Sequence, residues 1–478
     1  MPTPYAITDG KTVIEFTNNS IPVFLGNVTL TGNGEIPVSV DLDGATVNAV
    51  FPDTVNSAIT NNITVNDVIE TVNVSVVNNH DITPAMDSGV YDAFGRTRVC
   101  EVETIFQSTV INDNGSLYWN ELETGTANQS SSVWTQNTAS VALTVNASQN
   151  VTRVRQTYQR FNYQAGKSQE VMISFVPGST INGVRKEVGY GDANDGLFFQ
   201  TVNTGVGFCQ RSTANGTKVD TFVAQEDWNI DTLNGAGPSG ITLEVTKTQI
   251  LFIDFEWLGV GRTRLGFVID GQIIYCHAFN NANNLSTVYM RSPNLPLRYS
   301  ISGNGSQAAP STLTAICASV GTEGGLQLVG TPRAASSGLT EIALPNSGNL
   351  TLIKAIRLSA NGINTSVLLE SFDVLNTDAN ASAEIQLVLD PTLSASPSWS
   401  AVSNSQVEQA TGNATIAVTG GTLLHAGYIA SRSSATLSAT SKRTLGLSIN
   451  GTSQVLALCA SRLAGNPKVY GEIGWTEL

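Results

Sequence analysis

Residues 249–301 constrain the fold more than any other stretch, because they hold the chain's densest run of β-branched and aromatic residues. From Leu251 to Trp257 an apolar side chain recurs at every second position, which is the period of an extended strand. A second apolar run ends at Ile269, and Asp270 and Gly271 follow at once. An Asp-Gly pair tolerates the positive φ angles of a two-residue hairpin turn. This turn predicts a register with three opposed pairs: Ile269 and Gln272, Phe267 and Ile274, and Leu265 and Cys276.

Both faces of the expected hairpin are apolar. Leu265, Phe267 and Ile269 share one face, and the other carries Val268, Ile273, Tyr275 and Phe279. A sheet with two apolar faces has to be covered on both sides. The sequence therefore predicts an all-β fold with this hairpin at the centre of a β-sandwich or jelly roll.

The N-terminal residues have a different composition. Between Lys11 and Arg96 there is no Lys or Arg, although ten Asp and Glu residues fall there, and the apolar residues are thinly spread. Such a segment cannot build a core of its own, so it either stays unfolded or packs against copies of itself. We expect an extended β arm for assembly over residues 1–90, followed by two β-sandwich (jelly-roll-like) domains. These span 91–320 and 339–478, and the Gly- and Ser-rich residues 321–338 link them.

Charge and composition exclude several classes of partner. The net charge of −14 argues against nucleic acid, which needs Lys and Arg to displace counterions from phosphates. No apolar run reaches the roughly 18 residues needed to span a bilayer, and the N-terminus lacks a signal-peptide pattern, so we expect a soluble chain made in a cytoplasm, with no membrane insertion. Its five cysteines are widely spaced and include no C-x-x-C, so we expect no metal, disulfide scaffold or cofactor.

Two short motifs have a functional and a plain interpretation. Gly166-Lys167-Ser168 is the tail of a phosphate-binding loop, but Phe161 stands where that loop needs a glycine. The loop from Gly189 to Gly196 could offer Ca²⁺ the oxygens of Asp192, Asn194 and Asp195. It lacks the glutamate and the spacing of a full calcium loop, and Asp and Asn are also ordinary turn residues, so a plain connection is favoured.

The run Ile253-Asp254-Phe255-Glu256-Trp257-Leu258-Gly259 resembles the catalytic strand of laminarinase-type retaining glycoside hydrolases, which are concanavalin-like jelly rolls. The resemblance implies that Asp254 and Glu256 match the assisting acid and the acid/base, while Phe252 occupies the nucleophile position. Phenylalanine cannot form the glycosyl-enzyme ester, so we expect no catalytic residue and no enzyme of that type. A glycan-binding remnant of the fold is an alternative, because Trp and Tyr rings stack on sugars. Its candidate contacts are Trp228, Asp254, Glu256, Trp257 and Tyr275.

Longer stretches resemble a group of structural proteins of tailed bacteriophages that is common in environmental and marine phages. Examples of these stretches are DAFGRTRVCEVETIF, YQAGKSQEVMISF and VYMRSPNLPLRYSI. That resemblance implies a virion protein made in the host cytoplasm. The favoured interpretation is a homotrimeric tail, baseplate or head fibre that contributes to assembly and host attachment. Its expected partners are further copies of the chain, other virion proteins and a glycan of the host surface. A capsid or tail decoration (cement) protein is the first alternative, and a glycan-binding or glycan-cleaving jelly roll is the second.

Overall fold

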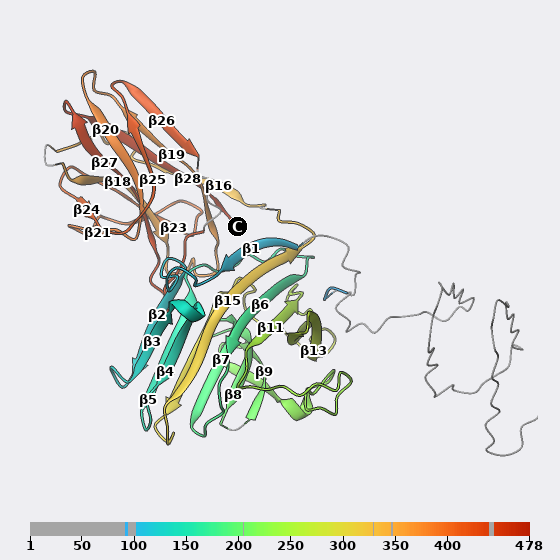
Figure 1. Cartoon of the computed structure of the whole chain (residues 1–478). Coiled ribbons are helices and arrows are strands. Elements are labelled where there is room, and N and C mark those ends of the chain that lie inside the picture. Colours follow the sequence, from blue (N-terminus) through green and yellow to red (C-terminus); the bar gives the residue numbers. More distant parts are fainter. Residues whose placement is uncertain (1–90, 94–101, 204, 328, 346–347, 439–443) are drawn as a thin grey trace, which may run out of the picture. The chain divides into compact units, whose positions relative to one another are not determined.

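The computed structural model describes residues 91–93, 102–203, 205–327, 329–345, 348–438 and 444–478 (Figure 1). These residues form an all-β fold, as the sequence predicts. In this part of the chain only two short 3-10 helices occur, Gln136–Thr138 (η1) and Gln225–Asp227 (η2). Neither is long and apolar enough to cross a membrane. The expected arm, residues 1–90, lies outside the described residues.

The first sandwich consists of two antiparallel sheets. The sheet that we call the β11 sheet has the strand order β13-β12-β11-β6-β15-β4-β3, with β1 paired to β15. Its strands are β1 (Val102–Ser108), β3 (Ser130–Thr135), β4 (Ser140–Val145), β6 (Gln169–Val176), β11 (Gln249–Phe255), β12 (Thr263–Ile269), β13 (Gln272–Phe279) and β15 (Ser311–Glu323). In Figure 1 the long yellow strand β15 crosses the middle of this sheet.

The opposing sheet, which we call the β8 sheet, has the order β10-β9-β8-β7-β14-β5-β2. Its strands are β2 (Trp119–Gly125), β5 (Asn150–Thr157), β7 (Val184–Gly191), β8 (Gly196–Val202), β9 (Gly205–Ser212), β10 (Val219–Ala224) and β14 (Leu297–Asn304).

Aromatic rings join the two sheets across a single core. Phe199 of β8 lies against Phe175 of β6 and Phe267 of β12, with ring centroids 5.7 and 5.4 Å apart. Aromatic pairs at such distances contribute about 1 kcal/mol beyond the burial of their area. These residues recur at alternate positions of their strands, so the period-two pattern of the sequence directs them inward.

The β12-β13 hairpin confirms two of the three predicted pairs. Ile269 lies opposite Gln272 and Phe267 opposite Ile274, but Leu265 lies opposite His277 because a β-bulge follows it. At the bulge a Cβ on Gly266 would come within 2.0 Å of the Ile274 carbonyl oxygen, so only glycine fits. The extra residue also moves Phe279, expected on the outer face, into the core.

The second sandwich has two sheets of its own around a separate core. The β19 sheet has the order β16-β28-β19-β26, with β17 paired to β28, and the β18 sheet has the order β21-β24-β18-β27-β20-β25, with β23 paired to β18 and β22. The β19 sheet contains β16 (Thr331–Ser336), β17 (Ile342–Ala343), β19 (Val367–Asn376), β26 (Ser433–Ser438) and β28 (Lys468–Glu477). The β18 sheet contains β18 (Leu350–Leu358), β20 (Ser382–Leu389), β21 (Thr392–Leu393), β22 (Ser400–Ala401), β23 (Val407–Thr411), β24 (Ala417–Thr419), β25 (Thr422–Ile429) and β27 (Val455–Ala464).

Residues 321–338, expected as a linker, contain more strand than the sequence suggests. β15 continues to Glu323, and β16 occupies Thr331 to Ser336. β16 pairs with β28, whose backbone needs partners along its whole length. Between the two strands lie residues 324–330, of which the structure describes all but residue 328.

Candidate functional site

Asp254, the first acid of the predicted sugar-binding strand, is fully buried. Its Oδ1 accepts a hydrogen bond from Arg264 Nε at 2.9 Å, and its Oδ2 accepts one from the Tyr275 hydroxyl at 2.6 Å. Arg264 lies directly opposite Asp254 on β12, and its guanidinium is 4.1 Å from the centre of the Tyr275 ring. A buried carboxylate held in this way serves the fold, because leaving either charge unpaired would be costly.

The chain entering the sandwich contributes to this cluster. Arg264 Nη2 donates a hydrogen bond to the Tyr91 carbonyl oxygen at 2.7 Å, and Asp92 and Ala93 are themselves buried. Asp254, Arg264 and Tyr275 therefore lie beneath protein. Asp254 and Tyr275, two of the five expected glycan contacts, are brought together, but their side chains are not offered to a sugar.

The other three expected contacts occupy separate environments. Trp228 is buried in the core, where its ring stacks on Phe208 with centroids 4.4 Å apart. Trp257 is half-buried, and its indole N–H donates to the Met290 carbonyl oxygen at 3.2 Å. Glu256 is half-buried, and its Oε1 accepts a hydrogen bond from the Arg262 N–H at 3.1 Å. The five residues do not form one surface.

The Asp192 loop is held by hydrogen bonds within the protein. Asp192 Oδ1 accepts from the N–H groups of Asn194 and Asp195, and its Oδ2 pairs with Arg160 at 2.6 Å. Burial alone would raise the pKa of Asp192, but Arg160 together with the N–H groups of Asn194 and Asp195 outweighs burial and lowers it. Asp195 accepts from the N–H and the hydroxyl of Thr213. These carboxylates stabilise the turn, and nowhere in the described ranges do three or more His, Cys, Asp and Glu residues gather to hold a metal ion.

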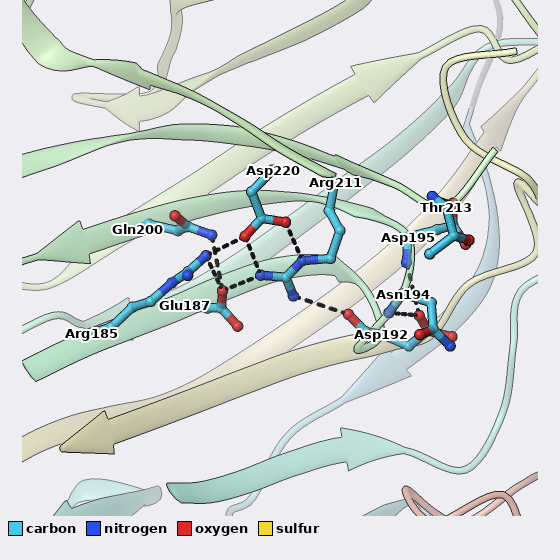
Figure 2. Close-up of polar contacts among 9 residues, drawn as sticks. All are labelled: Arg185, Glu187, Asp192, Asn194, Asp195, Gln200, Arg211, Thr213 and Asp220. Carbon is cyan, nitrogen blue, oxygen red and sulfur yellow. Dashed lines mark hydrogen bonds and ion pairs between the residues drawn. The ribbon is translucent and has the colours of Figure 1, made fainter. Parts of the chain in front are cut away.

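A charged network that the sequence analysis missed lies beside this loop on the β8 sheet (Figure 2). Arg211 bridges Asp220, with Nε 2.7 Å from Oδ1, and Glu187, with Nη2 2.6 Å from Oε1. Arg185 contacts the same two carboxylates at 2.7 and 2.9 Å, and Gln200 donates to Glu187. Burial would raise the pKa of Asp220 and Glu187, but the arginines outweigh it and lower both. The two carboxylates therefore stay charged inside a paired network.

The signal for this network in the sequence is weak. Arg185 and Glu187 are two residues apart on β7, so they share a face, but Arg211 and Asp220 come from β9 and β10. Only the register brings Arg211 opposite Asp220.

Two open, adjoining hollows on the β11 sheet have volumes of about 510 and 290 Å³ and share Ser174 and Ile250. We call the two together the β11 groove. The larger hollow mixes polar and apolar side chains: Thr242, Glu244, Thr248, Gln249 and Asp270 with Ile241, Leu243, Val268 and Ile269. The smaller hollow is lined by Met172, Cys317 and Ala318 and by the polar residues Gln107, Ser108, Thr109 and Ser319. None of the five expected glycan contacts lines either hollow.

No known protein family matches this sequence, and neither does any curated protein. Among solved structures, the chain is similar to a family 16 glycoside hydrolase, an endo-glucanase from Bacteroides ovatus, with 9% identity, a TM-score of 0.32 and coverage of 45% of this chain and 99% of that one. It is also similar to the carbohydrate recognition domain of Emp47p, at 10% identity, a TM-score of 0.28, and coverage of 47% and 99%. A legume lectin-like domain from Entamoeba histolytica has 11% identity, a TM-score of 0.25, and coverage of 42% and 89%. At these identities and scores, neither activity nor ligand carries over to this chain.

Proposed function

We propose that the first sandwich binds a glycan without cleaving it, and that the chain acts as an attachment protein. The observation that carries this proposal is the β11 groove, whose larger hollow of about 510 Å³ has the size of a small-molecule site. Its lining suits a sugar, because the exposed side chains of Glu244, Thr248 and Asp270 offer hydrogen-bonding groups for hydroxyls. Ile250 and Val268 offer apolar contact for the C–H faces of a ring.

Binding without cleavage is supported by the strand that resembles the hydrolase strand. Phe252 stands at the nucleophile position, and Asp254 is fully buried between Arg264 and Tyr275. A retaining hydrolase needs two carboxyl groups about 5 to 5.5 Å apart that reach the glycosidic bond. Neither Phe252 nor the buried Asp254 supplies such a group.

A glycan array with the full chain, followed by calorimetry on any bound glycan, tests this proposal. Ile250 is 39% exposed and belongs to both hollows, so Ile250→Arg should weaken binding at least tenfold. Val133→Arg is the matched control, because Val133 is 53% exposed on β3 of the same sheet and lies outside the groove. Equal affinity of Ile250→Arg and the wild type would refute the proposal, and release of reducing ends from the bound glycan would refute its non-catalytic part.

The virion is the second candidate setting for this protein. It is favoured by the order of the chain: an acidic segment without Lys or Arg over residues 12–95 precedes two sandwiches that each have a core. A fibre of this design trimerises through the arm, whereas a decoration protein assembles on a capsid. Mass spectrometry and antibody labelling of purified particles, from a phage whose genome encodes the chain, would show whether and where the particle carries this protein. Its absence from the particles would exclude a virion role and leave the glycan-binding proposal standing.

A further inference from the structure

Strand β25, Thr422–Ile429, is the last strand of the β18 sheet and pairs there with β20. Its sequence, TLLHAGYI, contains no Asp, Glu, Lys, Arg or Pro. Leu423 is 54% exposed and Tyr428 is 73% exposed. Tyr428 has the highest exposed fraction of the large exposed aromatic side chains among the described residues. Among the described residues no strand pairs with its other edge, and an uncharged eight-residue strand with an unpaired edge is a template for pairing with another chain.

Other edge strands carry protection that β25 lacks. The edge of β13 is covered, because the Ile230 and Asp231 N–H groups donate to its Cys276 carbonyl oxygen at 3.0 and 3.1 Å. β16 contains Pro332 and Arg333. β2 and β10 contain acidic residues, and β3 and β26 are shorter and rich in serine. Charges, proline and covering segments are the usual means by which proteins block such edges.

We propose that β25 pairs antiparallel with β25 of a second copy of this chain. The chain carries a net charge of −14, which opposes most contacts between copies, but β25 carries no acidic residue. A second copy of this strand therefore meets no charge repulsion along the strand itself.

The strand is also complementary to itself in shape. With Gly427 on the two-fold axis, Tyr428 faces the small Ala426 of the second copy, and His425 faces Ile429. Each pair shares a face of the sheet. Tyr428 and Ala426 lie opposite Glu384 and Gln386 of β20, whereas His425 and Ile429 lie opposite the core residues Leu387 and Ala383. This register keeps every face consistent and sets a large side chain against a small one.

Such a contact is isologous, so it closes after two copies and does not propagate into a fibril. It turns a monomer into a dimer, and it turns a trimer into a hexamer when the three β25 strands meet those of one second trimer. Light scattering of the full chain over a concentration series should therefore show a species of twice the smallest mass. Tyr428→Lys should shift the midpoint of this association at least tenfold to higher concentration, because edge lysines oppose pairing. A constant mass of the wild type, or an unchanged midpoint in Tyr428→Lys, would overturn the proposal.

A matched control is Leu463→Lys, since Leu463 is also 54% exposed, in the same sandwich but at the end of β27. It should leave the midpoint unchanged.

The register is tested separately by combining Ala426→Cys with Tyr428→Cys. Opposed Cα atoms in an antiparallel pair are about 4.5 to 5.5 Å apart, within the range of a disulfide. Mild oxidation should join two copies of this double variant and leave the wild type unlinked, and failure to join them would refute pairing centred on Gly427.

Discussion

At the scale of single residues, the sandwich uses its acids to neutralise buried arginines. Asp254 forms an ion pair with Arg264, and both side chains are fully buried. Glu121 forms an ion pair with Arg155. Ion pairs without solvent keep their geometry only while both members are present. The sequence shows such acids as candidates for chemistry because it does not reveal which cation faces them.

Arg264→Met should therefore destabilise the protein by about 3–5 kcal/mol, because it leaves the Asp254 carboxylate buried without its cation. Asp254→Asn combined with Arg264→Met should recover part of that loss, since no charge is then buried. Urea unfolding monitored by tryptophan fluorescence measures both changes. A loss below about 1 kcal/mol in the single variant would contradict the structural role given to this pair.

His277 should make the stability of the folded protein depend on pH. Burial lowers its pKa to about 4, and its Nδ1 accepts a hydrogen bond from the Asn229 N–H at 3.3 Å, which fits the neutral ring. Because the pKa of an unfolded histidine is about 6.5, the unfolded chain binds the proton more readily, and stability falls as the pH drops from about 6.5 to 4. The loss is on the order of 3 kcal/mol. His277→Gln should flatten this part of the pH profile of stability, and an unchanged slope would contradict the assignment.

At the scale of elements, the β12-β13 hairpin shows what local sequence determines. Asp270 and Gly271 have φ angles of 51° and 77°, so the turn residues predict both the turn and the first two pairs of the register. The bulge could not be predicted, because it depends on how closely the Ile274 carbonyl approaches Gly266. The burial of Trp228 could not be predicted for a related reason: it follows η2 outside any strand, where period two gives no direction.

Gly271→Ala should cost about 1 kcal/mol, because an L-residue at this positive φ is strained although no atom lies within 4 Å of the added Cβ. Gly205→Ala is the control. Gly205 begins β9 outside the left-handed region, and an added Cβ would lie an ordinary 3.8 Å from the Val202 carbonyl oxygen. Thermal unfolding of both variants tests the turn, and equal melting temperatures would show that the turn contributes nothing.

At the scale of the whole molecule, the sequence predicted two sandwiches correctly in kind, because alternation and turn residues recur through both parts of the chain. It did not predict the Arg211 network, whose members lie on β7, β8, β9 and β10 and meet only through the register of the β8 sheet. It also did not predict the β11 groove, which is lined by strands as distant in sequence as β1 and β12. Contacts between distant strands depend on the assembled fold, and no local pattern specifies them.

A chain that begins at Ser88 should keep the folded sandwiches and lose the trimer expected of the full chain. Within the described ranges every buried residue of the two main cores lies at or after Phe106, so the shortened chain retains both cores and should keep its β-sheet circular dichroism and a cooperative melt. Residues 12–95 contain ten acidic residues and no Lys or Arg, so we expect residues 12–90 to bury their scattered apolar side chains between chains. At concentrations below those at which β25 would pair, light scattering should give about three times 50.4 kDa for the full chain and a single copy for the shortened one. If the shortened chain were insoluble while residues 1–87 folded alone, the roles of arm and core would be reversed.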